Sequence, residues 1–193
     1  MSEYSEDIRA AVRVLRQGGV ILYPTDTVWG IGCDPRNPEA VAKVFKIKQR
    51  ADSKALILLA GSLAQLERTV DEVPEVAYQL IEYSEQPLTI VYDGTAPGAR
   101  IAPALLAADG TIAVRVSSEA FSRELCAAFG FPLVSTSANI SGQAAAATFA
   151  EISPEIIAAA DYVCTSRRDD NTPAKPSTVM RLSADGLFKI IRP

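Results

Sequence analysis

The first stretch that could do chemistry is a polar turn, Thr25-Asp26-Thr27, which follows the apolar residues 20–23 and a proline. Threonine hydroxyls and exposed backbone amides at the end of a strand can bind a carboxylate or a phosphate. The same residue types are common in Asx and ST turns that only join two strands, and the pattern alone favours that plainer interpretation. Gly30 and Gly32 lack the third glycine of a dinucleotide fingerprint, and the chain contains no P-loop.

A second stretch carries four cations, Lys46, Lys48, Arg50 and Lys54, at and just beyond the end of a helix expected over residues 37–48. Cations there complement the negative end of the helix dipole, which accounts for Lys46. Arg50 and Lys54 lie beyond that helix. Because a guanidinium binds phosphate through two donors and an ammonium is a mobile point charge, the two together suit a polyphosphate.

A third stretch, residues 135–142, reads Ser-Thr-Ser-Ala-Asn-Ile-Ser-Gly and follows the apolar residues 132–134. Small hydroxyl and amide groups supply many donors with little bulk, as an anion site requires, although a serine-rich surface loop has the same composition. Burial of Val134 and Ile140 would hold the loop against the core and favours the functional interpretation.

Arg115 interrupts the apolar residues 111–116. A buried charge without a partner is very costly, so this side chain either points to solvent or meets an anion, and the sequence leaves both open. Ser177 and Arg192 stand out only in combination with the other stretches.

The composition narrows the chemistry further. The 193 residues are 48% hydrophobic, with a formal net charge of -4 and no histidine. This excludes Ser-His and Cys-His nucleophiles and histidine-ligated metals. Cys33, Cys126 and Cys164 form no C-x-x-C motif and are expected to be buried, free thiols. No apolar run approaches the ~20 residues that span a bilayer. The acidic N-terminus is no secretory signal, so a soluble, cytoplasmic protein is predicted.

Helices and strands alternate irregularly along the chain. We expect a single α/β (α+β) domain over residues 1–193, with a mixed sheet, because several connections are too short for a parallel crossover. Helices are predicted over residues 5–17, 37–48, 63–70, 75–83 and 118–129, the last capped by Ser118. Strands are predicted over residues 20–23, 55–60, 88–92, 111–116, 133–135, 161–165, 178–182 and 187–191.

Taken together, these stretches resemble the YrdC/TsaC family of threonylcarbamoyl-AMP synthases over almost the whole chain. The resemblance rests on six blocks in the family's order: Tyr-Pro-Thr-Asp-Thr-Val-Trp-Gly (23–30), Lys-x-Arg (48–50) with Lys54, Pro-Leu-Thr (87–89), Ala-Val-Arg-Val (113–116), residues 135–142, and Pro-Ser-Thr-Val (176–179). It implies a YrdC-like fold, in which a twisted mixed sheet with flanking helices carries a concave, basic cleft.

The resemblance also implies an activity. A nucleotidyltransferase of this family would convert L-threonine, bicarbonate and ATP, with Mg²⁺, into threonylcarbamoyl-AMP and pyrophosphate. A separate tRNA threonylcarbamoyl transferase complex would use the product to modify an adenosine in tRNA. The positions that match the family's motifs would bind threonine through Thr27, Arg115, Ser135 and Ser177. They would bind the nucleotide through Arg50, Lys54, Thr111, Ser137, the backbone of Ala145, and Arg192. Lys48 joins Arg50 and Lys54 in the catalytic group, and Thr25, Asp26 and Asn139 would shape the cleft.

Three departures keep other interpretations open. Leu59 stands where some relatives have a histidine, Ala55 replaces a proline, and residues 84–87 replace a Trp-Pro-Gly-Pro turn. A paralogue with the same cleft and another substrate would show such changes. The second alternative is a module that binds double-stranded RNA or tRNA on the concave surface, although the net charge argues against strong RNA binding. The sequence also leaves open whether residues 166–175 close over the cleft as a lid.

Overall fold

The fold begins with a helix whose apolar residues are spaced to face one side. The computed structural model describes residues 2–49, 56–172, 176–183 and 186–193. In α1 (Ser5–Arg16), Ile8, Ala11, Val12 and Leu15 recur at helical spacing and are buried. Gly18 follows with a φ of 78°, a conformation that glycine adopts without steric cost and that ends the helix. The predicted first helix is therefore confirmed.

The remaining elements follow in an irregular order. The other α-helices are α2 (Pro38–Ile47), α3 (Leu63–Glu67), α4 (Glu75–Tyr83), α5 (Ala120–Phe129) and α6 (Pro154–Ala159). Two 3₁₀ turns are η1 (Pro103–Leu105) and η2 (Phe149–Glu151). The strands are β1 (Ile21–Tyr23), β2 (Gly30–Gly32), β3 (Ile57–Ala60), β4 (Leu88–Tyr92), β5 (Ile112–Val116), β6 (Leu133–Ser137), β7 (Tyr162–Val163), β8 (Thr178–Leu182) and β9 (Phe188–Arg192).

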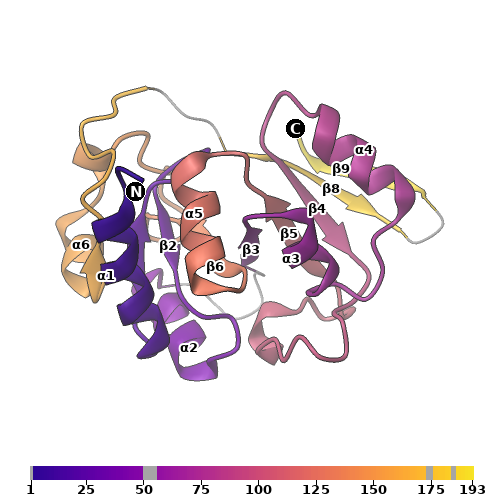
Figure 1. Ribbon diagram of the computed structural model, residues 1–193, viewed down its shortest axis with the longest axis horizontal. Helices are drawn as coiled ribbons and strands as arrows, with labels where there is room; N and C mark the ends of the chain where they lie inside the picture. The colour runs from indigo at the N-terminus through magenta and orange to yellow at the C-terminus, as the bar shows by residue number, and fades with distance from the viewer. Residues whose placement is uncertain (1, 50–55, 173–175, 184–185) are drawn as a thin grey trace.

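All of these strands join one twisted sheet in the order β7-β1-β2-β6-β3-β5-β4-β8-β9. The pairs β1–β7, β3–β5 and β4–β8 are parallel, and the other neighbouring pairs are antiparallel. The sheet is therefore mixed, as the short connections predicted. Figure 1 shows α5 and α3 lying across the front of the sheet, with α1 beside α5 and α4 over β4 and β8.

The two faces of the central strands differ in chemistry. Side chains alternate between faces along a strand, and residues paired across strands share a face. Leu58, Val114 and Val134 are paired neighbours, are buried, and form an apolar face. The alternating positions on the other face include Arg115 and Ser135. That second face carries the polar groups of the candidate site.

Several elements differ from the sequence-based expectation. The cap of α5 is Glu119, whose two carboxylate oxygens accept from the backbone amides of Phe121 and Ser122, so the expected cap at Ser118 is wrong. The physical reason is that a carboxylate can satisfy two free amides of a helix start, whereas a serine hydroxyl has a single oxygen. Strand β2 and helix α6 were not predicted, because both are short and have no clear periodicity.

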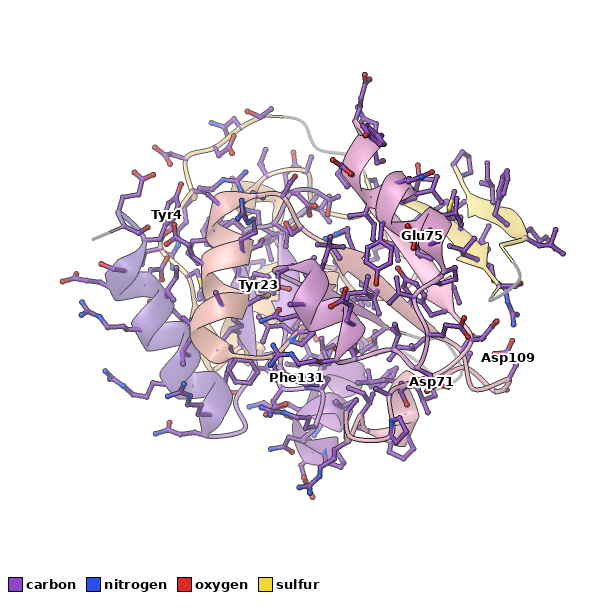
Figure 2. The ribbon with its side chains drawn as sticks, turned by 45° about the vertical axis from the view of Figure 1, so that its right-hand side comes forward. Tyr4, Tyr23, Asp71, Glu75, Asp109 and Phe131 are labelled. Atoms are coloured by element: carbon purple, nitrogen blue, oxygen red, sulfur yellow. The ribbon has the colours of Figure 1, made fainter. Side chains whose placement is uncertain are left out.

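Close packing on Tyr23 explains the two glycines of β2. The ring of Tyr23 lies in the interior of the molecule (Figure 2), and a Cβ at Gly32 would lie 2.7 Å from its Cε1 and 2.8 Å from the carbonyl oxygen of Val134. A Cβ at Gly30 would lie 3.2 Å from the same ring. These glycines therefore make room for an aromatic side chain, a steric role that needs no nucleotide.

Two expectations about the chain as a whole are also tested. Cys33, Cys126 and Cys164 are buried and free, as predicted. Among the residues that the structure describes, no helix has the length and apolar character needed to cross a membrane.

Candidate functional site

The polar face of the central strands forms the floor of an inner cavity of about 390 Å³. Its lining comes from four of the six sequence blocks and from residues outside them. The lining includes Thr25, Thr27, Gly30, Arg115, Ser135, Ser137, Ala145, Ser177, Ile191 and Arg192. The charged side chains among the described lining residues are both arginines, so this cavity is basic, as the cleft was expected to be.

Arg115 lies at the centre of the floor and is 4% exposed. On strand β5 it is paired with Leu59 of β3 on one side and with Thr89 of β4 on the other. Its Nη2 lies 3.0 Å from Oδ1 of Asp26. Its Nε is buried without a hydrogen-bond partner in the part of the chain that the structure describes. Of the two alternatives for this arginine, the anion partner is therefore correct.

Asp26 itself sits in a nearly closed position, with 10% of its side chain exposed. Burial raises the pKa of this carboxyl above its ordinary value, because the charged form loses its hydration, and the nearby Arg115 guanidinium acts in the opposite direction. The ion pair thus offsets part of the cost of burying the charge of Asp26.

The turn before β2 is built around the hydroxyl of Thr25. This hydroxyl donates to the carbonyl of Val28 at 2.8 Å and accepts from the amide of Thr27 at 3.0 Å, which makes an ST turn. The hydroxyls of Thr25 and Thr27 lie 3.0 Å apart. Since Thr25 has only one hydroxyl hydrogen, Thr27 is the donor in this contact, and Thr27 lines both cavities described here. The plain turn is therefore confirmed, and the functional interpretation stays a prediction.

The loop after β6 is held from behind by Lys48. This lysine is 1% exposed, and its Nζ donates to the carbonyl oxygens of Ser137 and Asn139 at 2.5 Å and 2.8 Å. The side-chain oxygen of Asn139 accepts from the hydroxyl of Ser137. The amide nitrogen of Asn139 donates to the carbonyls of Ile140 and Gln143. These contacts consequently hold the loop in one shape, in which Ser137 lines the inner cavity.

The opposite wall comes from the start of β8 and the end of β9. The hydroxyls of Ser177 and Thr89 lie 2.8 Å apart and are both buried. The guanidinium of Arg192 donates to the carbonyl of Ser177 at 2.8 Å and 3.2 Å. The antiparallel pairing of β8 with β9 therefore brings the penultimate residue of the chain into the site.

An outer cavity of about 880 Å³ adjoins the inner one. The two share Thr25, Thr27, Pro176 and Arg192. The outer cavity is lined in addition by Asp26, Trp29, Gln86, Pro87, Arg167, Asp170 and Thr178. The site thus consists of a small basic cavity beside a larger one, and Thr25 and Thr27 of the turn line both.

The structure brings together most of the predicted site residues. Those that line the inner cavity are Thr25, Thr27, Arg115, Ser135, Ser137, Ala145, Ser177 and Arg192, and Asp26 lines the outer one. Lys48 and Asn139 line neither cavity among the described residues; Nζ of Lys48 donates to two carbonyls of the loop after β6, and its expected catalytic role stays a prediction. Arg50 and Lys54 lie outside the described residues.

Thr111 is the predicted residue that the geometry separates from the others. Its hydroxyl donates to Asp109 at 2.8 Å, and it does not line either cavity among the described residues. Asp109 lies at the edge of the molecule in Figure 2 and also binds Arg181. An Asx-type contact within three residues explains this threonine without a ligand.

Sequence reasoning assigned no role to several residues of the site. Thr89 and Trp29 belong to quoted motifs, so the motifs could have suggested them. Arg167 and Asp170 belong to a charged segment that was considered only as a lid. Ile191 lines the inner cavity and carries no chemical signal in its sequence context.

A site for Mg²⁺, the ion that the family resemblance implies, would need oxygen ligands. The structure holds no group of three or more Asp, Glu, His or Cys side chains suited to a metal within the described ranges 2–49, 56–172, 176–183 and 186–193. A Mg²⁺ ion bound mainly by phosphate oxygens and water needs only one or two protein ligands, and the hydroxyl-rich cavity walls fit that mode.

The chain is similar to members of one protein family in both sequence and structure. The Sua5/YciO/YrdC family model, described as "Telomere recombination", matches residues 13–193. The chain is 40% identical over 181 residues to a threonylcarbamoyl-AMP synthase of Pseudoalteromonas translucida, covering 93% of this chain and 94% of the relative.

Solved structures agree with the sequence comparison. P. abyssi Sua5 complexed with L-threonine superposes with a TM-score of 0.83 at 26% identity. The match covers 96% of this chain and 53% of Sua5, so the chain spans about half the length of that relative. E. coli YciO superposes with a TM-score of 0.81 at 27% identity, covering 96% of this chain and 87% of YciO.

Proposed function

The chain belongs to the Sua5/YciO/YrdC family, and on this premise we propose that it is a threonylcarbamoyl-AMP synthase. Such a nucleotidyltransferase joins L-threonine, bicarbonate and ATP into threonylcarbamoyl-AMP and releases pyrophosphate. The observation that carries the proposal is Arg115, a buried guanidinium with an unused donor on the floor of a small hydroxyl-lined cavity. Relatives that carry this name at 40–44% identity support it.

Threonine is placed in the inner cavity. The carboxylate binds Arg115, because a guanidinium with a free Nε–H can donate to it while Asp26 stays bound at Nη2. The hydroxyls of Thr27, Ser135 and Ser177 surround that point and offer acceptors for the amine and partners for the side-chain hydroxyl. The P. abyssi Sua5 structure was solved with L-threonine, which supports an amino acid as ligand.

The nucleotide is placed beside threonine, toward the loop after β6 and the end of β9. Ser137, the backbone of Ala145, and Arg192 line this part of the cavity. Arg50 and Lys54 lie outside the described residues and remain in the proposal as phosphate partners on the strength of the family's motif. Mg²⁺ is proposed to arrive with ATP and to neutralise phosphate charge. Thr111 is left out, because its hydroxyl is bound to Asp109.

The reaction follows from these positions. The neutral amine of threonine adds to the carbon of CO₂ and loses a proton to solvent, which gives a carbamate; when bicarbonate is the source of the carbon, a water molecule leaves as the carbamate forms. A carbamate oxygen then attacks the α-phosphorus of ATP, and the bond to the β,γ-phosphates breaks, so that pyrophosphate leaves with the electron pair. This step depends on alignment and on charge neutralisation more than on a strong base. A chain without histidine can therefore carry it out with arginines, hydroxyls and backbone amides.

The product is reactive and must be passed on. We propose that a separate tRNA threonylcarbamoyl transferase complex consumes it, which places this chain in tRNA processing in the cytoplasm. Weak contact with tRNA remains part of the proposal. The relatives are named as synthases, which does not favour a module whose main role is RNA binding. The net charge of -4 also argues against such a module.

The test is pyrophosphate release measured with L-threonine and bicarbonate each present or omitted, and with serine in place of threonine. We expect release that requires both substrates and prefers threonine to serine. Arg50→Ala and Lys54→Ala are expected to abolish release while the protein stays folded by circular dichroism. Release that is the same with and without threonine would refute the proposal.

A matched pair of variants tests the threonine site itself. Thr27→Val removes a cavity hydroxyl and is expected to raise the KM for threonine about tenfold, the loss of about one hydrogen bond to a charged group. Thr69→Val removes an equally buried hydroxyl that donates to the carbonyl of Gln65, away from both cavities, and should leave that KM unchanged.

A further inference from the structure

We propose that Arg167 is a positioning residue, which holds the turn at residues 25–27 in the shape that binds threonine. This inference rests on the proposed function, since it assigns a further role in the same site. Arg167 lies in a charged segment after β7, far from the turn in sequence, and it lines the outer cavity beside it.

The guanidinium of Arg167 binds three separate parts of the chain. Its Nη1 donates to the carbonyl oxygen of Thr25 at 3.2 Å and lies 3.1 Å from Oε1 of Glu119. Its Nη2 and Nε both donate to Oδ2 of Asp170, at 2.8 Å and 3.2 Å. Because most of its N–H donors are already used within the protein, Arg167 is suited to holding structure rather than to binding a substrate.

The backbone of Arg167 supports the same interpretation. Its φ is 57°, in the left-handed region that costs energy for a residue with a side chain. Such a conformation persists only where the surrounding contacts require it. The contacts to Thr25, Glu119 and Asp170 meet that requirement.

The segment before Arg167 is anchored by a buried acid on α1. The amides of Thr165 and Ser166 donate to Oδ2 of Asp7 at 2.9 Å and 2.7 Å, and the hydroxyl of Tyr162 donates to Oδ1. Asp7 is 7% exposed. The chain therefore reaches Arg167 from a fixed point, so that its side chain can transmit that position to the turn.

The turn is held from a second side by the start of α5. Glu119, which caps α5, binds Arg167, and the hydroxyl of Ser122 donates to the carbonyl of Pro24 at 3.3 Å. Consecutive carbonyls of Pro24 and Thr25 are thus both fixed from outside the turn. Any shift of Thr25 would also move the next two residues, and with them the carboxylate of Asp26 and the hydroxyl of Thr27.

The neighbouring Arg168 provides a matched control. It carries the same charge, but its guanidinium donates to the carbonyls of Cys164 and Val163 and lies over the ring of Phe149. It lines neither cavity among the described residues. Replacing it removes one positive charge from the same segment without releasing Thr25.

The experiment is calorimetric titration of L-threonine into the wild-type chain, Arg167→Ala and Arg168→Ala. For Arg167→Ala we expect the Kd of threonine to rise about tenfold, as for the loss of a charge-assisted hydrogen bond. Arg168→Ala should bind threonine as the wild type does. Arg167→Lys keeps the charge but loses the planar fork, so its Kd should lie between those of the wild type and Arg167→Ala.

Steady-state kinetics separate positioning from general damage. A positioning role predicts that Arg167→Ala raises the KM for threonine while the KM for ATP stays close to that of the wild type. Unchanged threonine affinity in Arg167→Ala, or equal rises in both KM values, would overturn the inference. If the wild type binds threonine but releases no pyrophosphate, the proposed function fails while the threonine Kd still decides the role of Arg167. If the wild type binds no threonine, both fail.

Discussion

Nη2 of Arg115 and Oδ1 of Asp26 lie 3.0 Å apart, and both side chains are almost completely enclosed. The pair joins the floor of the inner cavity to the wall of the outer one, because Arg115 lines the first and Asp26 the second. Two charges that are removed from water in this way depend on each other, since each would be very costly alone.

Arg115→Ala is therefore expected to reduce the stability of the protein in addition to removing the proposed contact with threonine. Leaving Asp26 buried without its partner should lower the free energy of unfolding by about 3 kcal/mol near neutral pH, as measured by urea denaturation. Burial already raises the pKa of Asp26, and without Arg115 that pKa rises further. The loss should therefore shrink as the pH falls and Asp26 takes up a proton. A variant as stable as the wild type at neutral pH would show that the pair contributes nothing.

Lys48→Met tests the support behind the loop after β6. The substitution keeps most of the side-chain volume but leaves the carbonyls of Ser137 and Asn139 without the ammonium donor, which should lower the free energy of unfolding by about 1–3 kcal/mol. Because Ser137 lies at the proposed nucleotide position, we expect the KM for ATP to rise more than the KM for threonine. Lys46→Met, at an exposed position on the same helix, is the control and should change neither KM. An unchanged KM for ATP in Lys48→Met would contradict this role.

Gly32→Ala tests the packing of β2 on Tyr23. The new methyl group would lie 2.8 Å from the carbonyl oxygen of Val134, which belongs to the backbone and cannot turn away. We expect a loss of about 1–3 kcal/mol in the free energy of unfolding, typical of an overpacked core. Gly98→Ala is the matched control, because a Cβ there meets no atom within 4 Å. Equal stability of the two variants in thermal unfolding would argue against steric packing as the reason for Gly32.

Asp7→Asn tests the anchor on α1 through its dependence on pH. Burial opposes the charge of Asp7, but hydrogen bonds from Ser166, Tyr162 and Thr165 outweigh it and lower the pKa below 3.8. A lowered pKa stabilises the folded state above the unfolded-state value, and this contribution is lost as the pH falls through the folded-state value. The variant should be less stable than the wild type near pH ~7 by about 1–2 kcal/mol, and the difference should vanish in acid.

The control for this pH experiment is Asp71→Asn, at an exposed position visible in Figure 2. Its stability should follow that of the wild type at every pH. A difference between Asp7→Asn and the wild type that persisted at low pH would mean that the charge of Asp7 is not the stabilising feature.

Local sequence signals predict several helices and strands correctly. The predicted bounds of α4, β4 and β8 agree with the structure, and Asn37, the first residue of the helix expected over residues 37–48, caps α2. Periodicity and capping depend on residues within one or two turns of each other, so they can be identified along the chain. The family motifs likewise indicated Thr27, Arg115, Ser135 and Ser177 as residues of one site.

The partners of the charged side chains, by contrast, depend on how distant segments pack together. Lys48 and Arg115 are both cations in or beside apolar segments, yet one supports a loop from behind and the other lies on the cavity floor. Glu119 rather than Ser118 caps α5, and Arg167 reaches Thr25 across the fold. Such partners are chosen by packing between distant segments, because the cost of burying a charge depends on everything around it and not on its neighbours in the chain.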